Sequence, residues 1–410
     1  MSSLTGSTRR SPGHLGPRGR LTWLLFLVGA AGSYLLNGMG AILASIQDER
    51  GASRAEVGLY PTLFAAGLIV MGFVADRIIA RIDRPVALRL SIVGIIAGAW
   101  LLAVPDRTVS SLGAVVMGAS GGLMITLTPV IIAALHPRRT VGIFGELQAA
   151  NSAASVVAPL VIGLALGLGL GWRPAYLLPT LVMALMLPLL AGIPRARRTH
   201  HDVTPAPVPR PAAGRARSVA RWLDILIAVG AEFCMVFWAA SAFRDWHGAS
   251  DDVAAALTAM FLLGMASARA VATPVTRVVP EAWRLVTGGC LVSLVGFAVF
   301  WAGPSIPIAA VGAIVVGLGL GLQYPVLLPL FVSGYPDAPD RAAARGALAS
   351  GLAIGGAPLV LAYLSDRLGL HEAYLIVPLL LALLAVRVGM RRELGPRPSE
   401  PTTAEMPTSA

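Results

Sequence analysis

The chain has 410 residues, of which 56% are hydrophobic and 13% are charged, and its formal net charge is +11. A soluble globular protein carries about 25% charged residues, so this chain has too little charge to cover a water-facing surface of normal size. The composition excludes an ordinary cytosolic enzyme and a disordered protein. A secreted disulfide scaffold is excluded as well, because the only two cysteines, Cys234 and Cys290, both lie in apolar runs.

Twelve apolar runs follow one another along the chain, each long enough to cross a membrane as a helix. A run of about 18 or more apolar residues with almost no charge is typical of a transmembrane helix. The runs are too long and too rich in Gly, Ala and Leu for the strands of a membrane barrel, which need about 9–11 alternating residues. The sequence therefore predicts an all-α polytopic membrane protein. The predicted spans are 21–46, 55–75, 86–104, 109–134, 141–169, 174–193, 222–243, 253–277, 285–302, 305–332, 343–364 and 370–388.

The arginines predict how these spans are oriented. All 32 residues counted as Lys+Arg are Arg. With a cytoplasmic N-terminus, 25 of them fall in cytoplasmic segments, six fall outside and Arg269 lies within a span. Such an excess of positive charge is typical of the cytoplasmic loops of membrane proteins. We therefore expect both termini to be cytoplasmic. The net charge then reflects membrane topology, so we expect no nucleic-acid partner.

A polar stretch at 194–221 separates the first six spans from the last six. It is rich in Pro and Arg and has no apolar periodicity, which predicts a flexible or semi-rigid cytoplasmic linker. The predicted domain order is a cytoplasmic tail at 1–20, a six-helix bundle at 21–193, the linker at 194–221, a second six-helix bundle at 222–388 and a cytoplasmic tail at 389–410.

The two sets of spans resemble each other at a shift of about 197 to 199 residues. Four short matches occur in the same order, which indicates an internal repeat. Parallel six-helix repeats joined by a linker are an architecture of secondary transporters, which hold substrate between the repeats near the middle of the membrane. The matched positions include Phe64 with Phe261, Gly118 with Gly317, Ala158-Pro159 with Ala357-Pro358, and Ala175-Tyr176 with Ala373-Tyr374.

The loop after the span at 55–75 carries the sequence Gly72-Phe-Val-Ala-Asp76-Arg77-Ile-Ile-Ala-Arg81. It resembles the G-x-L-A-D-R-x-G-R-R signature of the major facilitator superfamily, and the chain resembles that family over nearly its whole length. The resemblance implies that this loop latches the two halves in an outward-open state. We call Gly72, Asp76, Arg77 and Arg81 the conformational latch. The alternative is a plain surface ion pair that caps a helix.

Two further segments bear on direction and coupling. The span at 141–169 contains Ala154-x-x-x-Ala158-Pro159-x-x-Ile162-Gly163, which is similar to a family pattern associated with exporters. Ala replaces Gly twice in that pattern. Residues 115–130 carry no charge, whereas many proton-driven members of the family have an Arg in this span. The resemblance therefore favours efflux without reproducing the usual proton relay.

Glu232 and Arg269 are the charges placed most deeply in the predicted spans. Charges at membrane depth are costly, about 2.5 to 3.5 kcal/mol on insertion scales, so such residues are candidates for function. Glu232 lies about 15 Å and Arg269 about 12 Å from the cytoplasmic ends of consecutive spans, at 1.5 Å per residue. We expect them to pair, either as a working site that exchanges its partner for substrate or proton, or as a static contact.

Other polar or aromatic side chains in the spans are further candidates for the substrate and proton pathway. Asn and Gln in membrane helices also form plain interhelical hydrogen bonds, and an aromatic there is as often packing, so both interpretations stay open. Glu146 lies either in the cavity or near the lipid headgroups. The candidates are Asn37, Glu146, Asn151, Gln323 and Trp238.

The sequence thus predicts a secondary active transporter of a small molecule, working by alternating access, with proton-coupled efflux or exchange ahead of uptake of a small organic solute or anion. A polytopic membrane enzyme is a remote alternative, because the outer segments are short and hold little acidic or His clustering. We expect a monomer in the cell inner membrane, in contact with the lipid bilayer, that uses substrate and protons and needs no cofactor or metal.

Overall fold

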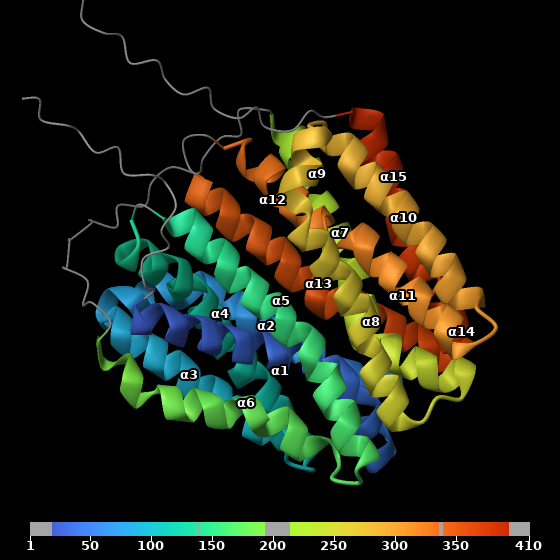
Figure 1. Cartoon of the computed structure of the whole chain (residues 1–410), viewed down its shortest axis with the longest axis horizontal. Helices are drawn as coiled ribbons and strands as arrows, with labels where there is room; N and C mark the ends of the chain where they lie inside the picture. The colour runs from blue at the N-terminus through green and yellow to red at the C-terminus, as the bar shows by residue number, and fades with distance from the viewer. Residues whose placement is uncertain (1–18, 138, 193–213, 336–338, 393–410) are drawn as a thin grey trace, which may run out of the picture.

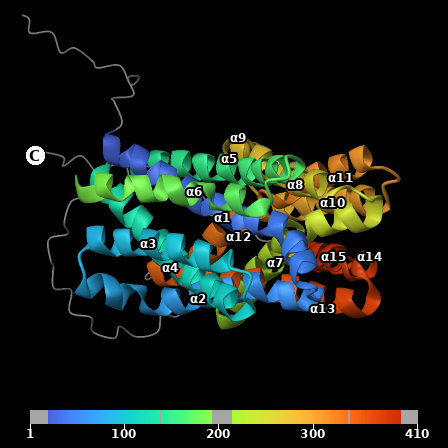
Figure 2. The same ribbon diagram turned by 90° about the horizontal axis from the view of Figure 1, so that it is seen from below.

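The structure is a computed structural model, and it describes residues 19–137, 139–192, 214–335 and 339–392. Within these ranges every regular element is a helix. The helices form two bundles that lie side by side, one coloured blue to green and the other yellow to red (Figure 1; Figure 2). The prediction of an all-α architecture is confirmed.

The first bundle contains the helices before residue 193. Local signals define several of its helix ends: Ser53 and Glu56 form a reciprocal capping box at the start of α2, and the Asp106 side chain accepts a hydrogen bond from the Val109 amide at the start of α4. The elements are α1 (Arg20–Arg50), α2 (Arg54–Arg81), α3 (Arg84–Leu102), α4 (Arg107–Leu135), α5 (Thr140–Gly167), α6 (Trp172–Met186) and the short 3-10 helix η1 (Pro188–Gly192).

The second bundle contains the helices after residue 213. Three of its predicted spans are interrupted: 253–277 at Val271, 305–332 at Gly321 and 370–388 near Tyr374. The elements are α7 (Arg215–His247), α8 (Asp251–Ala270), α9 (Ala272–Val278), α10 (Ala282–Ala302), α11 (Ile306–Leu320), α12 (Gln323–Val332), α13 (Pro339–Leu368), α14 (Leu370–Ala373) and α15 (Ile376–Arg391).

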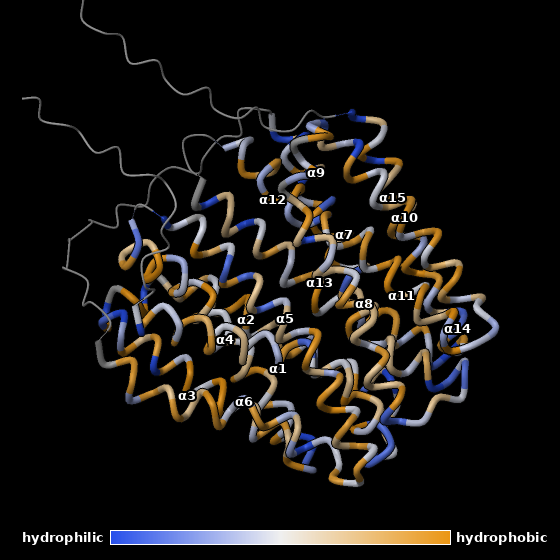
Figure 3. Tube along the Cα trace, in the orientation of Figure 1, coloured by the Kyte–Doolittle hydropathy of each residue, from blue (hydrophilic) through white to orange (hydrophobic). Residues whose placement is uncertain are grey.

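Eleven helical segments of the described ranges are long and apolar enough to cross a membrane. The remaining predicted span, 174–193, corresponds to α6 and η1. Helix α6 has only 15 residues. It ends just before Pro188, whose ring cannot continue an α-helix without losing a backbone hydrogen bond. Many large apolar side chains are exposed, including Leu164, Leu185 and Leu379, each more than 60% exposed. Hydrophobic residues extend along the helices of both bundles (Figure 3). Such a surface fits a lipid environment.

Helix α7 begins earlier than predicted, at Arg215, inside the segment 194–221 that the sequence analysis assigned to the linker. Side chains in this segment contact residues that are distant in the sequence, and amino-acid composition alone does not reveal such contacts. The Ser218 hydroxyl hydrogen-bonds the Tyr335 hydroxyl, and Arg221 Nη1 donates to the Leu330 carbonyl at 2.7 Å. Residues 194–213 lie outside the described residues. Likewise, α15 continues to Arg391, past the predicted start of the C-terminal tail at 389.

Close glycine contacts repeat between the two bundles. A Cβ added to Gly118 of α4 would overlap the carbonyl oxygen of Phe64 in α2. A Cβ added to Gly317 of α11 would overlap the carbonyl oxygen of Phe261 in α8 in the same way. Small residues let helix backbones approach closely in membranes. In the sequence, Phe64 is matched with Phe261 and Gly118 with Gly317. The internal repeat therefore reflects equivalent helix packing in the two bundles.

Candidate functional site

The two bundles meet along three pairs of helices. Helices α1 and α7 pack in the middle, α5 packs on α8 along one edge, and α2 packs on α13 along the other (Figure 2). Any residue in the centre of this contact belongs to one of these helices or faces them. The candidate site must therefore be sought where polar side chains reach the contact between the halves.

Glu232 and Arg269 form an ion pair across α7 and α8. Arg269 Nη2 lies 3.3 Å from Glu232 Oε1. The Glu232 side chain is 13% exposed and that of Arg269 is 37% exposed. The predicted contact between the two residues is confirmed, while its role stays a prediction. The asymmetry in exposure means that the guanidinium remains accessible to a second anion or polar group.

The local structure explains why the arginine is tolerated at this depth. Arg269 lies in the last turn of α8, which ends at Ala270, before the break at Val271. A cation in the last turn of a helix interacts favourably with the exposed carbonyl groups there. Glu232 lies inside α7 between the buried residues Ala231 and Phe233, so its carboxylate has little access to water except beside Arg269.

Tyr324 is a member of the site that the predicted residue set lacks. It lies in the first turn of α12, just after the interruption at Gly321, and its hydroxyl interacts electrostatically with Ser350 of α13 and with the Glu232–Arg269 pair. The signal in the sequence was the polar pair at 323–324 inside an apolar span. Four different helices therefore contribute polar groups here: α7, α8, α12 and α13.

Gln323 and Trp238 are both buried in packed protein. Gln323 is 2% exposed, and its Nε2 donates to the Val286 carbonyl of α10 at 3.1 Å. Trp238 is fully buried, and its Nε1 donates to the Pro358 carbonyl of α13 at 3.1 Å. Both side chains are helix-to-helix contacts in this conformation. Of the two interpretations left open for them, this conformation shows the packing contacts, and a role in the substrate pathway stays a prediction.

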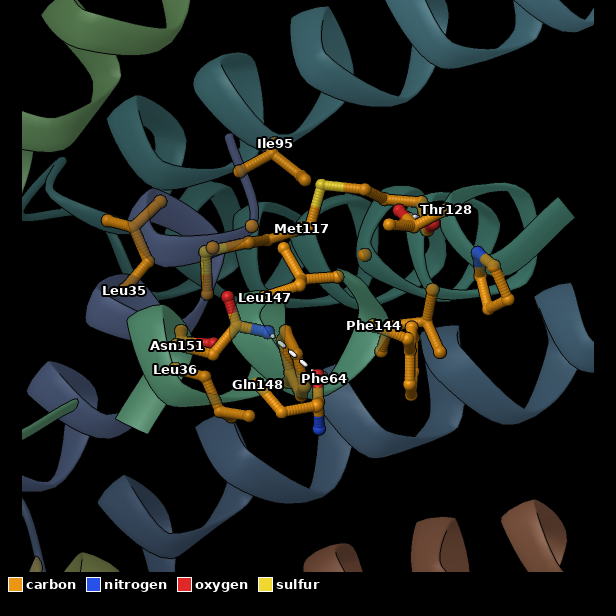
Figure 4. A pocket seen from close by; sticks show the side chains of 17 residues that line it. Leu35, Leu36, Phe64, Ile95, Met117, Thr128, Phe144, Leu147, Gln148 and Asn151 are labelled. Atoms are coloured by element: carbon orange, nitrogen blue, oxygen red, sulfur yellow. Dashed lines mark hydrogen bonds between the residues drawn. The ribbon is translucent and has the colours of Figure 1, made fainter. Parts of the chain in front are cut away.

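The polar residues of the first bundle divide into two groups. Asn37 Nδ2 donates to the Ser33 carbonyl and to Ser155 Oγ, both at 2.9 Å, and so joins α1 to α5. Asn151 Nδ2 donates to Gln148 Oε1 at 3.0 Å along α5 (Figure 4). Gln148 is exposed, whereas Glu146 in the second turn of α5 is half-buried. Asn151 and Gln148 lie on the wall of a cavity, and Asn37 serves interhelical packing.

That cavity lies inside the first bundle, between α1, α4 and α5, and has a volume of about 130 Å³. Figure 4 shows side chains from these helices, together with Phe64 of α2 and Ile95 of α3, turned toward a common space. The walls are mainly apolar, with Met117, Met124 and Leu147 prominent among them. A ligand that enters this space meets hydrocarbon and thioether groups, with amides at one side.

The conformational latch lies at the end of α2. The side chain of Asp76 falls outside the described residues. Arg77 and Arg81 are exposed, and a Cβ built on Gly72 would meet no neighbouring atom within 4 Å. Among the described residues, no hydrogen bond or ion pair joins these three positions to the second bundle.

At the opposite end of α2, charged residues join the two halves. The Asp366 carboxylate of α13 accepts hydrogen bonds from the backbone amides of Arg54 and Ala55, at 3.0 and 2.8 Å. Arg244 Nη1 of α7 lies 2.6 Å from Asp48 Oδ2 of α1, and Arg54 pairs with Asp245. We call Asp48, Arg54, Arg244, Asp245 and Asp366 the interdomain clasp. It closes one end of the contact between the halves.

The clasp is not among the predicted sites, although the sequence carries a signal for it. Six arginines lie on the predicted outer side, whereas most of the arginines lie on the predicted cytoplasmic side. In the structure each of them has a partner, as Arg173 has in Glu49 at 2.7 Å and Arg107 in Glu56 at 2.8 Å. An arginine on the side that is poor in arginine therefore marks an ion pair or a ring contact. The other four are Arg50, Arg54, Arg244 and Arg367.

Two bundles of apolar helices that meet along three helix pairs, with a clasp at one end, have the architecture of a multi-pass membrane transporter. The family model of the Major Facilitator Superfamily matches residues 22–246, and this range is more than half of the chain. The chain belongs to this superfamily. No curated protein matches the sequence.

Solved transporter structures share the fold at low sequence identity. A D-xylose-proton symporter has a TM-score of 0.73 at 16% identity, covering 90% of this chain and 96% of its own. A mutant of the nucleoside transporter NupG has a TM-score of 0.74 at 12% identity, covering 90% and 99%. A bacterial homologue of the human lysosomal transporter Spinster, in an inward-facing and occupied conformation, has a TM-score of 0.69 at 16% identity, covering 92% and 98%. The fold therefore extends through both halves.

Proposed function

We propose that this protein is a secondary active transporter that moves a small molecule by alternating access, with proton-coupled efflux or exchange as the working mode. The observation that carries the proposal is the Glu232–Arg269 pair, which lies where four helices of the second bundle converge and leaves the guanidinium 37% exposed. Protonation of Glu232 weakens its attraction to Arg269, and the freed guanidinium then binds a polar or anionic group of the substrate. Proton binding at Glu232 and substrate binding at Arg269 are thus coupled through one pair of charges.

The orientation of the chain supports a specific conformational state. We place the arginine-rich ends of the helices, including Arg81 and Arg391, on the cytoplasmic side. The interdomain clasp then lies on the outer side, and the conformational latch lies on the cytoplasmic side. A clasp that is closed outside and a latch that is not engaged inside correspond to an inward-facing state. Engagement of Gly72, Asp76, Arg77 and Arg81 with the second bundle would accompany the opposite state.

The proposed direction of transport, efflux, is inferred from a segment of α5. The segment that resembles the exporter pattern packs on α8, and a Cβ added to Gly163 would lie 2.5 Å from the Asp252 carbonyl oxygen. The segment therefore supports closure of the same end as the clasp. Uptake of a small organic solute or anion is the second candidate, favoured by the uncharged stretch 115–130 in α4, where the usual proton-relay arginine of the family is missing. The proposed location is the cell inner membrane, with the protein as a monomer.

A transport assay tests proton coupling. The purified protein is placed in liposomes with an imposed pH gradient, and a panel of small organic solutes is screened for substrate-dependent proton flux with an enclosed pH-sensitive dye. We expect at least one solute to move protons in the wild type and none to do so with Glu232→Gln. Solute movement that ignores the pH gradient in the wild type would exclude proton coupling and favour the uptake alternative.

Protease digestion tests the proposed orientation. Residues 194–210 hold four arginines, so trypsin added to inside-out vesicles is expected to cut there and to release two fragments of about half the chain. Right-side-out vesicles should give no such cut. The matched control is the outer arginine Arg107, which is 57% exposed and should become the accessible site in right-side-out vesicles. Cleavage of the 194–210 segment from outside would reverse the whole topology.

A further inference from the structure

The cavity inside the first bundle has the chemistry of a binding site for an apolar ring. Its walls come from α1, α2, α3, α4 and α5, so it belongs to one bundle and lies apart from the Glu232–Arg269 pair. None of its lining residues carries a charge. The lining residues include Phe64, Met117, Gly121, Met124, Phe144 and Gln148.

Two polar side chains at the cavity wall bond within the protein, whereas the Asn151 Oδ1 oxygen is buried with no hydrogen-bonding partner among the described residues. Thr128 Oγ1 donates to the Met124 carbonyl at 2.7 Å, and Asn151 Nδ2 donates to Gln148 Oε1 at 3.0 Å. Burial of a polar group without a hydrogen-bonding partner costs free energy, and a stable buried water needs two to four polar partners. The walls therefore favour a largely apolar occupant, and a single hydrogen-bond donor on that occupant could pair with Asn151 Oδ1.

Size and wall chemistry narrow the occupant further. The cavity volume is about 130 Å³. An apolar cavity of about 150 Å³ in another protein stays dry and binds benzene. Two methionines and two phenylalanines line this one, and thioether sulfur atoms and aromatic edges both make favourable contacts with an aromatic ring. A six-membered ring matches the cavity in volume and in chemistry.

One wall of the cavity belongs to α5, the helix that packs on α8 of the second bundle. Gln148 lies at one side of the cavity, and Figure 4 shows its side chain directed away from the apolar wall. Helices α5 and α8 run antiparallel, with Gly163 beside Ala256 and Gly167 beside Asp252. Ala150 lies thirteen residues before Gly163 on α5, and Arg269 lies thirteen residues after Ala256 on α8. Because each residue rises about 1.5 Å, Ala150 and Arg269 lie at about the same height. A ligand that extends from the cavity along α5 would therefore reach the level of Arg269 on α8.

We propose that this cavity is a subsite for the apolar ring of a small amphipathic ligand, whose polar end projects past Gln148 toward the second bundle. The proposal rests on the proposed function, since it names the chemical class of the substrate: one neutral aromatic or alicyclic ring with one polar end.

Benzyl alcohol is the probe, because it combines one ring with one hydroxyl. The protein is labelled with [13C-methyl]methionine and held in lipid nanodiscs, and methyl NMR follows a titration. We expect saturable shifts at Met117 and Met124. Met235 and Met265, buried in the second bundle, serve as internal controls for general partitioning into the membrane and should not shift.

Gly121→Leu is the test variant. A Cβ on Gly121 of α4 would meet only the Phe64 ring tip at 3.9 Å, so the new side chain fills the cavity without striking backbone. Gly145→Leu is the matched control, because Gly145 of α5 is exposed and has no neighbour within 4 Å. We expect Gly121→Leu to abolish the saturable shifts and Gly145→Leu to keep them. Should Gly121→Leu fail to fold, Gly121→Ala replaces it, with weaker benzyl alcohol binding expected.

The proposal is overturned if benzyl alcohol binds the Gly121 variant as tightly as the wild type, or if Met235 and Met265 shift in parallel with Met117 and Met124. Binding in nanodiscs needs no transport, so the two proposals fail separately. Saturable binding in a protein that moves no solute in the liposome assay would contradict the proposed function alone. Proton-coupled transport without saturable ring binding would contradict the cavity subsite alone.

Discussion

Transport is expected to be lost when either member of the Glu232–Arg269 pair is changed, by Glu232→Gln or by Arg269→Ala. Removing one partner of a buried ion pair strands the other charge at a cost of about 3–5 kcal/mol. The 37% exposure of Arg269 lowers the cost when Glu232 is the residue removed, whereas Glu232, at 13%, is more strongly affected by the loss of Arg269. We therefore expect Arg269→Ala to lower the thermal stability more than Glu232→Gln. Liposome transport and a melting curve of the purified protein measure the two effects.

The double variant separates a working site from a static contact. If the pair only holds α7 and α8 together, replacing both charges by neutral residues restores folding and transport. If the pair handles substrate and proton, the double variant folds but stays inactive, which is the result that we expect. Arg284→Ala is the matched control, because Arg284 is 57% exposed and pairs with Glu281 outside the site. Normal transport by both single variants would remove the pair from the mechanism.

Gly40→Val is expected to stop the transport cycle while leaving both bundles folded. Gly40 lies on α1 where it crosses α7, and an added Cβ would overlap the carbonyl of Val236. The two halves then cannot close at the end that carries the clasp. Overpacking of this kind costs about 1–3 kcal/mol, which displaces a two-state equilibrium by about 5- to 150-fold. We expect the transport rate to fall by about tenfold or more.

Cysteine accessibility measures this shift directly. Thr62 of α2 donates to the Gly355 carbonyl of α13 at 2.7 Å, so a Thr62→Cys reporter lies in the closed contact between the halves. A membrane-impermeant maleimide applied from outside should label this reporter slowly in the parent protein and faster with Gly40→Val. Cys234 and Cys290 are buried and give little background.

Two other glycines provide controls for Gly40→Val. Gly118→Val should reduce the amount of folded protein, since its Cβ overlaps the Phe64 carbonyl inside one bundle. Gly145→Val, at an exposed position, should behave as the parent. Equal labelling of the Thr62→Cys reporter with and without Gly40→Val would show that the crossing of α1 and α7 does not control closure.

Features that depend on chain length and local spacing were readable from the sequence. The apolar runs predicted the helices because a helix must satisfy its backbone hydrogen bonds inside a membrane. The pairing of Glu232 with Arg269 followed from equal depth on consecutive spans, and the contact is 3.3 Å long. The matched glycines Gly118 and Gly317 predicted equivalent packing in the two halves, because each lets one helix approach the backbone of another.

The tertiary structure decided which way a side chain points around its helix and which residues meet across the halves. Membrane helices are apolar on all sides, so no hydrophobic face indicates the direction of a polar residue. Gln323 therefore turned out to pack on α10, while its neighbour Tyr324 joins the site. Asp366 reaches the start of α2 across more than 300 residues of chain. The sequence by itself determined the helices, the repeat and the central ion pair; the clasp and the ring-sized cavity exist only because the folded helices bring distant residues together.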